Sequence, residues 1–431
     1  MLPDRWRYLL KYLQWDRPPP LADMDRLYVR PPRSSADQIV RKLKANPTGL
    51  QKFLLVGARG GGKSTELREV ARRLGDHTMI ASIDLDASGV SALAVSAFDL
   101  LYLSGLAMLR LVPDEQREDL YKNLIAAYGG HKKESLARTA REALSGLMPF
   151  ADAASRLAAV TEMIASAPIV SAGLNLANAG VRLLGRDKLV TETSSEGRRL
   201  QDACRTIAGV VRAASEGRPL CVLIDGLEKM NGEANERFQR VFCYTRLLTD
   251  AEWTAVIAAP PSTLTATNSA VNLGYVNVPV WGFAPEEAGI LQNLLCRRFE
   301  AADIDPAGHA DEAALAHLVS QSGGLPRHAI QMLQYAVECA LDRNAVCLDA
   351  EHVEEGIRYV AESLGQGLTI EDLDLLAVVH RRHQLPGDER AARLFADGRI
   401  VARAPAPGRR LPGFFVHPVL EPELRHADGD A

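Results

Sequence analysis

Eight consecutive residues of the chain have the types and the spacing that phosphate binding requires. The run from Gly57 to Ser64, GARGGGKS, matches the GxxxxGK[ST] pattern of a Walker A loop in full. In such a loop, glycines let backbone N–H groups turn toward an anion, the lysine reaches the β- and γ-phosphates, and the serine hydroxyl binds Mg²⁺. The sequence therefore predicts a site for ATP and Mg²⁺ made by Gly57, Ala58, Arg59, Gly60, Gly61, Gly62, Lys63, Ser64 and Thr65.

The segments on either side of the loop are those that must position it. Phe53 to Val56 is a short apolar run, typical of a buried parallel strand. Apolar residues from Leu67 to Leu74 recur at helical spacing, so a helix follows the loop and directs the positive end of its dipole at the phosphates. We expect Lys63 to act in catalysis, Ser64 to bind the metal and Thr65 to lie near the α-phosphate.

A second candidate metal ligand ends another apolar run. Residues 220–225, LCVLID, have the form of a Walker B strand, in which Asp225 binds Mg²⁺ directly or through water. The nearest acid downstream is Glu228, whereas many P-loop ATPases place that acid immediately after the aspartate, where this chain has Gly226. Either Glu228 orients the attacking water from three residues on, or hydrolysis is slow. A loop salt bridge with Lys229 is the alternative role.

Three further apolar runs, at residues 79–85, 253–259 and 275–280, complete a set of five predicted strands. Helical segments between most of them indicate an α/β fold with a parallel five-stranded sheet covered on both faces. The run at 253–259 is followed by Ser262 and Thr263. A polar side chain at this strand end could touch the γ-phosphate, so Ser262 or Thr263 is a candidate sensor, and a plain turn is the alternative.

A set of motifs in this order resembles a known class of proteins. After the sheet come a helical segment and then residues 322–327, SGGLPR. From Leu27 to Leu364 the chain resembles AAA+ and STAND ATPases, in particular archaeal origin-recognition ATPases and bacterial defence switches. The GKSTEL and DGLE stretches are also similar to STAND and KAP-type NTPases. The resemblance implies an ASCE-type P-loop NTPase with a helical lid, and it gives Arg327 the role of a second sensor that touches the γ-phosphate.

Two features usual in such proteins are not evident in the sequence. Arg237, Arg240 and Arg246 follow the Walker B run on a predicted helix, but their spacing fits a solvated face as well as an arginine finger. Ring assembly therefore has no support from the sequence. The chain also shows no internal repeat with a period of 20 to 50 residues, so a sensing partner would act in trans.

The length of 431 residues predicts two or three domains, at roughly 100 to 200 residues per domain. An amphipathic arm with four aromatic residues comes first, and we expect it to pack on its own domain or on a partner protein. The predicted parts are the arm at 1–26, a P-loop ATPase domain at 27–282 with a helical insertion at 88–219, a helical lid at 283–364 and a winged-helix-like domain at 365–431.

The insertion contains a stretch, Met163 to Val181, that has no charged residue over nineteen positions. This is about the length that spans a bilayer, and KAP-type NTPases carry membrane helices between their Walker motifs. Several serines and asparagines make the stretch only mildly apolar. We therefore favour a buried or partner-facing helical hairpin over a membrane span or a mobile loop.

The C-terminal region has the pattern of a winged helix. Two helical segments precede short apolar runs at 398–402 and 414–417, which predict a two-stranded wing. Between His380 and Arg410, eight arginines against three acids give a local charge of +5, in a chain whose net charge is −4. By resemblance, this domain either contacts duplex DNA or packs on the nucleotide domain and holds it shut.

The remaining composition favours a cytoplasmic protein. Six scattered cysteines form no CxxC pair, which argues against a zinc site or a disulfide framework. The N-terminus lacks the features of a secretory signal. We expect an ATP-hydrolysing switch that regulates a partner protein or its own assembly in a bacterial conflict or defence system. The alternatives are an ATP-dependent loader or initiator that binds duplex DNA, and a scaffold that binds ATP but scarcely hydrolyses it.

Overall fold

A computed structural model describes most of the chain in two compact units. The loop–lid unit comprises Met1–Ser34, Val56–Glu66 and Pro279–Ala431, and the sheet unit comprises Ser35–Leu55 and Leu67–Val278. The predicted domain boundaries at residues 26, 282 and 364 stay a prediction. The described residues are 2–46, 50–85, 95–129, 172–174, 191, 193–227, 241–243, 245–259, 273–405 and 411–424.

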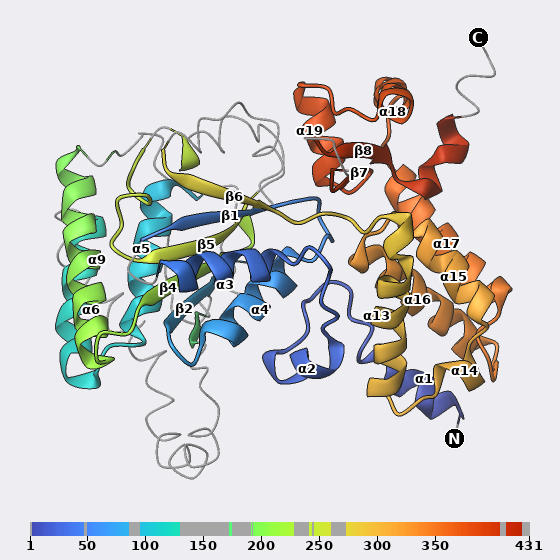
Figure 1. Cartoon of the computed structure of the whole chain (residues 1–431), viewed down its shortest axis with the longest axis horizontal. Coiled ribbons are helices and arrows are strands. Elements are labelled where there is room, and N and C mark those ends of the chain that lie inside the picture. The colour runs from blue at the N-terminus through green and yellow to red at the C-terminus, as the bar shows by residue number, and fades with distance from the viewer. Residues whose placement is uncertain are drawn as a thin grey trace. The chain divides into compact units, whose positions relative to one another are not determined.

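The sheet unit is built on one sheet with the strand order β3-β2-β4-β5-β1-β6 (Figure 1). Strand β2 runs parallel to β3 and β4, and β4 runs parallel to β5. The five predicted strands are confirmed, and β3 is a sixth that the sequence pattern did not indicate. The strands are β1 (Lys52–Val56), β2 (Met79–Asp84), β3 (Ala172–Leu174), β4 (Leu220–Asp225), β5 (Thr254–Ala259) and β6 (Tyr275–Pro279).

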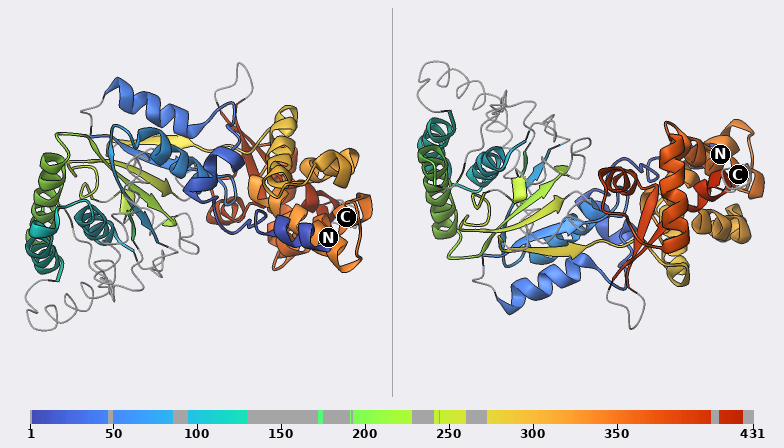
Figure 2. Two further views of the ribbon diagram at one scale, coloured as in Figure 1. Left: turned by 90° about the horizontal axis from the view of Figure 1, so that it is seen from below. Right: turned by 90° about the horizontal axis from the view of Figure 1, so that it is seen from above.

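Helix α5 explains how part of the insertion folds. All thirteen of its residues are buried, because the helix packs on β2, β3 and β4 and is covered by α6 and α9. Figure 2 shows α6 and α9 lying side by side. The insertion thus contains helices as predicted, but β3 makes it more than a helical subdomain. The described helices that lie wholly or mostly in the sheet unit are α3 (Ser35–Ala45), α4 (Lys63–Leu74), α5 (Ala97–Leu109), α6 (Asp114–Gly129) and α9 (Ser195–Ala214), of which the last three belong to the insertion.

The uncharged stretch Met163 to Val181 lies outside the described residues except for 172–174, which form strand β3 rather than part of a helical hairpin. Among the described helices, none is long and apolar enough to cross a membrane.

A buried lysine fixes the strand that leads into the phosphate loop. Lys52 is 2% exposed, and its ammonium donates hydrogen bonds to the carbonyls of Ala251 at 2.9 Å and Trp253 at 2.6 Å. Burial lowers the pKa of Lys52 to about 8. The lysine joins the beginning of β1 to the segment that precedes β5, so the position of β1 within its sheet is well specified.

The loop–lid unit holds the helices of the predicted lid together with the N-terminal arm. The arm packs on its own chain, as expected: Trp6 is 1% exposed, donates to the carbonyl of Ala345 at 2.9 Å and meets Phe299 edge to face. The helices are α1 (Leu2–Leu10), α2 (Met24–Leu27), α13 (Ala288–Ala301), α14 (Pro306–His309), α15 (Glu312–Gln321), α16 (Pro326–Asp342) and α17 (Ala350–Gly365), with single 3₁₀ turns at Leu21–Asp23 and Pro285–Glu287.

The helices and the two-stranded wing that the sequence pattern predicted are present within the same unit, in a region that we call the winged helix. It consists of α18 (Ile370–Arg382), α19 (Glu389–Ala396), β7 (Ile400–Arg403), β8 (Gly413–Val416) and a 3₁₀ turn at Pro418–Leu420. Strands β7 and β8 pair antiparallel, with Ile400 opposite Val416. A capping box between Thr369 and Asp372 begins α18, which accounts for the sharp start of that helix.

Candidate nucleotide-binding site

The predicted phosphate loop lies between β1 and α4, as the motif requires. Lys63 is the first residue of α4 and is 4% exposed. Its ammonium donates to the carbonyls of Gly57 at 2.9 Å and Ala58 at 3.0 Å. A phosphate oxygen would offer this ammonium a charged acceptor, which makes a stronger hydrogen bond than a carbonyl does. The lysine is therefore positioned to exchange bonds within the loop for bonds to a nucleotide.

The lid contacts the loop directly at Gly60. The backbone N–H of Arg327, in the first turn of α16, donates to the carbonyl of Gly60 at 3.2 Å. Gly60 has a φ of +83°, and a Cβ atom there would lie only 2.7 Å from the Cβ of Arg327. The structure thus brings the predicted sensor residue Arg327 beside the loop, and only glycine fits at the contact. The guanidinium of Arg327 also lies over the ring of Trp15, 5.8 Å from its centroid.

The winged helix contacts the neighbouring residue of the loop. The backbone N–H of Arg59 donates to the carbonyl of Ala396, the last residue of α19, at 3.2 Å. A carbonyl at a helix C-terminus has no partner within its own helix, so this contact also satisfies the end of α19. The main chain of the loop is therefore bonded at Arg59 to the winged helix and at Gly60 to the lid.

Two buried histidines join the lid to the winged helix close to this contact. Nε2 of His417 lies 2.9 Å from Nδ1 of His328 and 3.0 Å from the carbonyl oxygen of Ser322. Because a carbonyl only accepts, we assign the proton of His417 to Nε2, from which it is shared with His328. Burial lowers the pKa of His417 to about 4. Burial and the nearby His417, Arg327 and Arg59 also hold the pKa of His328 well below its ordinary value.

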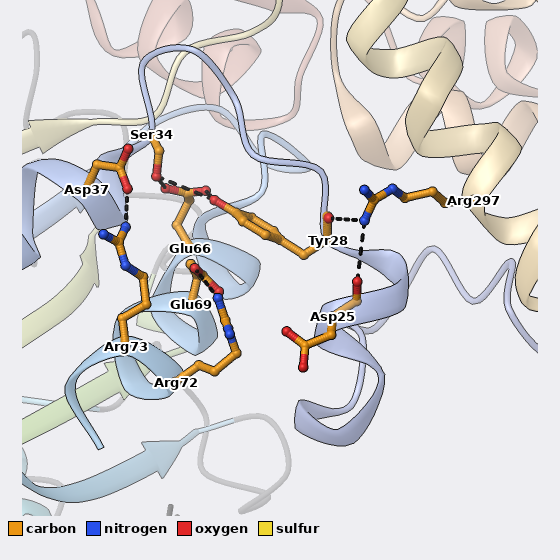
Figure 3. A network of polar contacts seen from close by, with 9 residues as sticks. All are labelled: Asp25, Tyr28, Ser34, Asp37, Glu66, Glu69, Arg72, Arg73 and Arg297. Carbon is orange, nitrogen blue, oxygen red and sulfur yellow. Dashed lines mark hydrogen bonds and ion pairs between the residues drawn. The ribbon is translucent and has the colours of Figure 1, made fainter. Parts of the chain in front are cut away.

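A third set of contacts joins α4, the helix that follows the phosphate loop and that we call the loop helix, to residues nearer the N-terminus of the chain (Figure 3). Glu66, in the first turn of α4, is 4% exposed and accepts hydrogen bonds from the hydroxyls of Tyr28 and Ser34, each at 2.9 Å. The main-chain carbonyl of Tyr28 in turn accepts from Arg297 of the lid helix α13. The side chain of Tyr28 thus contacts the loop helix, while its carbonyl contacts the lid.

The predicted metal ligand Asp225 ends strand β4, in the sheet unit. It stands directly opposite Asp84 in the parallel register of β4 and β2, so two carboxylates end neighbouring strands. Carboxylate oxygens are ligands that Mg²⁺ prefers, and the residue types fit that ion. Burial lowers the pKa of Arg68, while the negative charges of Asp225 and Asp84 act in the opposite direction. Asp84 is a candidate that the sequence could have indicated, because the runs MIASID and LCVLID end alike.

Several predicted residues fall outside this description. Glu228, Ser262 and their alternatives Lys229 and Thr263 lie outside the described residues, as do Arg237 and Arg240. Arg246 is exposed and does not lie on a helix, contrary to the expectation from the sequence. Its backbone carbonyl instead accepts a bond from Asp250 in a turn.

The basic patch of the winged helix is partly neutralised within its own fold. Arg393 donates to Asp372 at 2.6 Å, and Arg390 lies 3.5 Å from Glu371. Arg403 stacks on Phe415, 4.4 Å from the ring centroid. The acids at 371 and 372 precede the stretch from His380 to Arg410 over which the charge of +5 was counted. The local excess of positive charge is therefore smaller than the sequence count indicated.

No protein-family model and no curated protein sequence matches the chain. Among solved structures, the chain is similar to the Aeropyrum pernix ORC2 protein in its ADP form, at 12% identity and a TM-score of 0.42 over 97% of this chain and 96% of that one. It is also similar to the Aeropyrum pernix ORC1 protein in complex with DNA, at 13% identity and a TM-score of 0.41 over 93% of each chain. The Thermotoga maritima RuvB Holliday junction branch migration motor is similar at 14% identity and a TM-score of 0.37, over 91% and 92%.

Origin-recognition proteins, to which the motifs showed a resemblance, are thus among the solved structures similar to this chain.

Proposed function

We propose that the chain is a nucleotide-operated switch that binds ATP with Mg²⁺ at the phosphate loop and hydrolyses it. The observation that carries this proposal is the pair of main-chain hydrogen bonds at the loop. Arg59 donates to Ala396 of the winged helix, and Gly60 accepts from Arg327 of the lid. A change in the conformation of the loop on nucleotide binding would therefore alter its contacts with both the lid and the winged helix, as in switches whose elements are ordered by a γ-phosphate.

Each predicted residue has a role in this proposal. The loop from Gly57 to Thr65 surrounds the phosphates, Lys63 neutralises charge on the β- and γ-phosphates, and Arg327 reports the γ-phosphate to the lid. Ser64 and Asp225 are the residues that would hold Mg²⁺, whose positive charge would stabilise the charge that develops in phosphoryl transfer. Glu228 orients the water and Ser262 contacts the γ-phosphate.

The setting we propose is the control of a protein partner or of self-association. The similarity of the motifs to STAND and KAP-type NTPases supports a bacterial conflict system as that setting. Duplex DNA is the alternative partner, bound through the arginines of the winged helix. The ion pairs of Arg390 and Arg393 with Glu371 and Asp372 weigh against it, because phosphate binding would have to compete with them.

The experiment that tests the switch is a measurement of ATP affinity, turnover and particle mass for the wild type and for Lys63→Ala, with and without duplex DNA. A switch predicts that ATP changes the particle mass or a proteolytic pattern, that DNA changes nothing, and that Lys63→Ala removes both ATP binding and the change. Turnover that rises with DNA and falls steeply with salt would favour the loader instead. Wild-type ATP affinity in Lys63→Ala would exclude the proposed site.

A further inference from the structure

Residues 24–34, which we call the strap, are bound both to the phosphate-loop helix and to the lid. The strap contains the short helix α2 and the segment that follows it. Tyr28 makes both connections: its hydroxyl donates to Glu66 at 2.9 Å, and its main-chain carbonyl accepts from Arg297 at 2.9 Å (Figure 3). One residue therefore joins α4 to α13.

The connection to the loop helix is made through a buried carboxylate. Glu66 comes three residues after Lys63 and lies in the same first turn of α4. Its two oxygens accept from Tyr28 and Ser34, whose hydroxyl oxygens are 3.4 Å apart. Hydrogen bonds to a charged acceptor are stronger than those between neutral groups. Removing them from a buried carboxylate therefore costs a large amount of free energy. The strap and the first turn of α4 are therefore held to move together.

The connection to the lid is made by two consecutive arginines of α13. Tyr28 is the C-cap of α2, where helix carbonyls lack partners within the helix. Arg297 donates to the carbonyls of Tyr28 and Asp25, and Arg298 donates to that of Leu27 at 3.3 Å. Cationic donors at a helix C-terminus satisfy these carbonyls and interact favourably with the helix dipole.

Arg298 shows how firmly this end is fixed. Its side chain is 4% exposed, and burial lowers its pKa to about 10. The strap also returns a bond, because Arg26 donates to the carbonyl of Ala301 at the end of α13 at 3.1 Å. The lid helix and the strap are thus connected in both directions.

We infer that Tyr28 is a positioning residue that couples the lid to the phosphate loop, so that recognition of the γ-phosphate by Arg327 depends on the bond between Tyr28 and Glu66. This inference rests on the proposed function. Helix α13 packs on α16, which carries Arg327, so a lid held by the strap keeps Arg327 at its place beside Gly60. Without the strap, ATP binding must first order the lid. ADP lacks the γ-phosphate that Arg327 would contact, so it depends less on that order.

The test compares Tyr28→Phe, which removes the hydroxyl that donates to Glu66 of α4, with Arg297→Met, which removes the donor from the lid to the carbonyls of Tyr28 and Asp25. Affinities for ATP and ADP are measured by calorimetry on the full chain. We expect each variant to weaken ATP binding by about tenfold, the scale of one hydrogen bond to a charged group, and to weaken ADP binding much less. Because the two bonds act in series, the double variant should be no weaker than either single one.

The matched control is Tyr12→Phe, which removes a hydroxyl contact with Tyr8 in an exposed part of the N-terminal arm and should leave both affinities unchanged. Thermal midpoints check that every variant is folded. An unchanged ratio of ATP to ADP affinity in Tyr28→Phe, or effects that multiply in the double variant, would overturn the inference. If Lys63→Ala binds ATP as the wild type does, the proposed function fails; if it does not, and Tyr28→Phe matches the wild type, only the strap inference fails.

Discussion

The phosphate loop is held from two sides of the loop–lid unit by different chemistry. On the strap side, a buried carboxylate accepts two hydroxyl donors, and arginines satisfy helix carbonyls. On the winged-helix side, one main-chain hydrogen bond joins Arg59 to Ala396, and a pair of neutral histidines joins the winged helix to the lid. Charged groups that lose their partners in the interior are costly, whereas a single neutral hydrogen bond contributes only about 1 kcal/mol. The difference indicates a permanent attachment through the strap and a releasable one through the winged helix.

The largest expected effect comes from breaking the strap side at its acid. Glu66→Ala removes the buried carboxylate to which the hydroxyls of Tyr28 and Ser34 donate, and it should lower the free energy of unfolding by about 3 kcal/mol. Glu69→Ala on the same helix is the matched control, since Glu69 is as buried as Glu66 but its partner Arg72 is 38% exposed and can be rehydrated when the carboxylate is removed. That variant should lose only about 1 kcal/mol. Urea denaturation measures both, and equal losses would show that the bonds from Tyr28 and Ser34 give Glu66 no special weight on the strap side.

The winged-helix side should instead be sensitive to acid. The pKa of His417 lies near 4 in the folded protein against 6.5 in the unfolded chain, so the unfolded chain binds the proton more readily. The contribution of His417 is therefore complete above pH 6.5 and is lost as the pH falls toward 4, by about 2 kcal/mol at pH 5. His328, whose pKa is also lowered, adds to the loss in the same direction.

His417→Gln keeps a donor for the carbonyl of Ser322 but does not titrate, so it tests this assignment. Its stability should vary less with pH between 7 and 5 than that of the wild type, measured by urea denaturation at each pH. A strap variant such as Tyr28→Phe should retain the full pH dependence. An identical pH profile in the wild type and His417→Gln would show that the acid sensitivity arises elsewhere.

The sequence predicted the parts of this site that are formed by consecutive residues with a local pattern. Strand, loop and helix from Lys52 to Leu74 follow from local patterns, as do the lid turn and the two-stranded wing. Strand β3 could not be recognised, because three residues such as Ala172–Leu174 show no periodicity and gain their place only by pairing with β2.

The contacts around the loop were beyond the reach of local patterns. The bond between Arg59 and Ala396 joins two main-chain groups. Because nearly every residue type carries such groups, the identity of the side chains does not predict it. Tyr28 and Glu66 are 38 positions apart, and each alone is an ordinary residue of its segment. The residues from His380 to Arg410 do carry a net charge of +5. The ion pairs of Arg390 with Glu371 and of Arg393 with Asp372 could not be predicted, because they depend on how α18 and α19 pack.

The smallest expected effect tests whether this packing within the winged helix supports its contact with the loop. Asp372 in α18 is fully buried and accepts from Arg393 in α19, the helix whose last carbonyl receives the bond from Arg59. Arg393→Ala should cost about 1 kcal/mol, since the arginine is half exposed and Asp372 keeps the hydrogen bonds of its capping box. Arg382→Ala, at an exposed position of α18, is the control and should cost nothing measurable.

The same pair of variants separates a structural role from a role in DNA binding. If Arg393 serves the fold, its loss lowers the melting midpoint, and the loss shrinks at high salt because an exposed ion pair is screened. If it served duplex DNA, its removal would instead reduce the slope of log affinity against log salt by about 0.9 in a gel-shift series. We expect the first result, because Arg393 is committed to Asp372 and stabilises the helix that presents Ala396 to the phosphate loop.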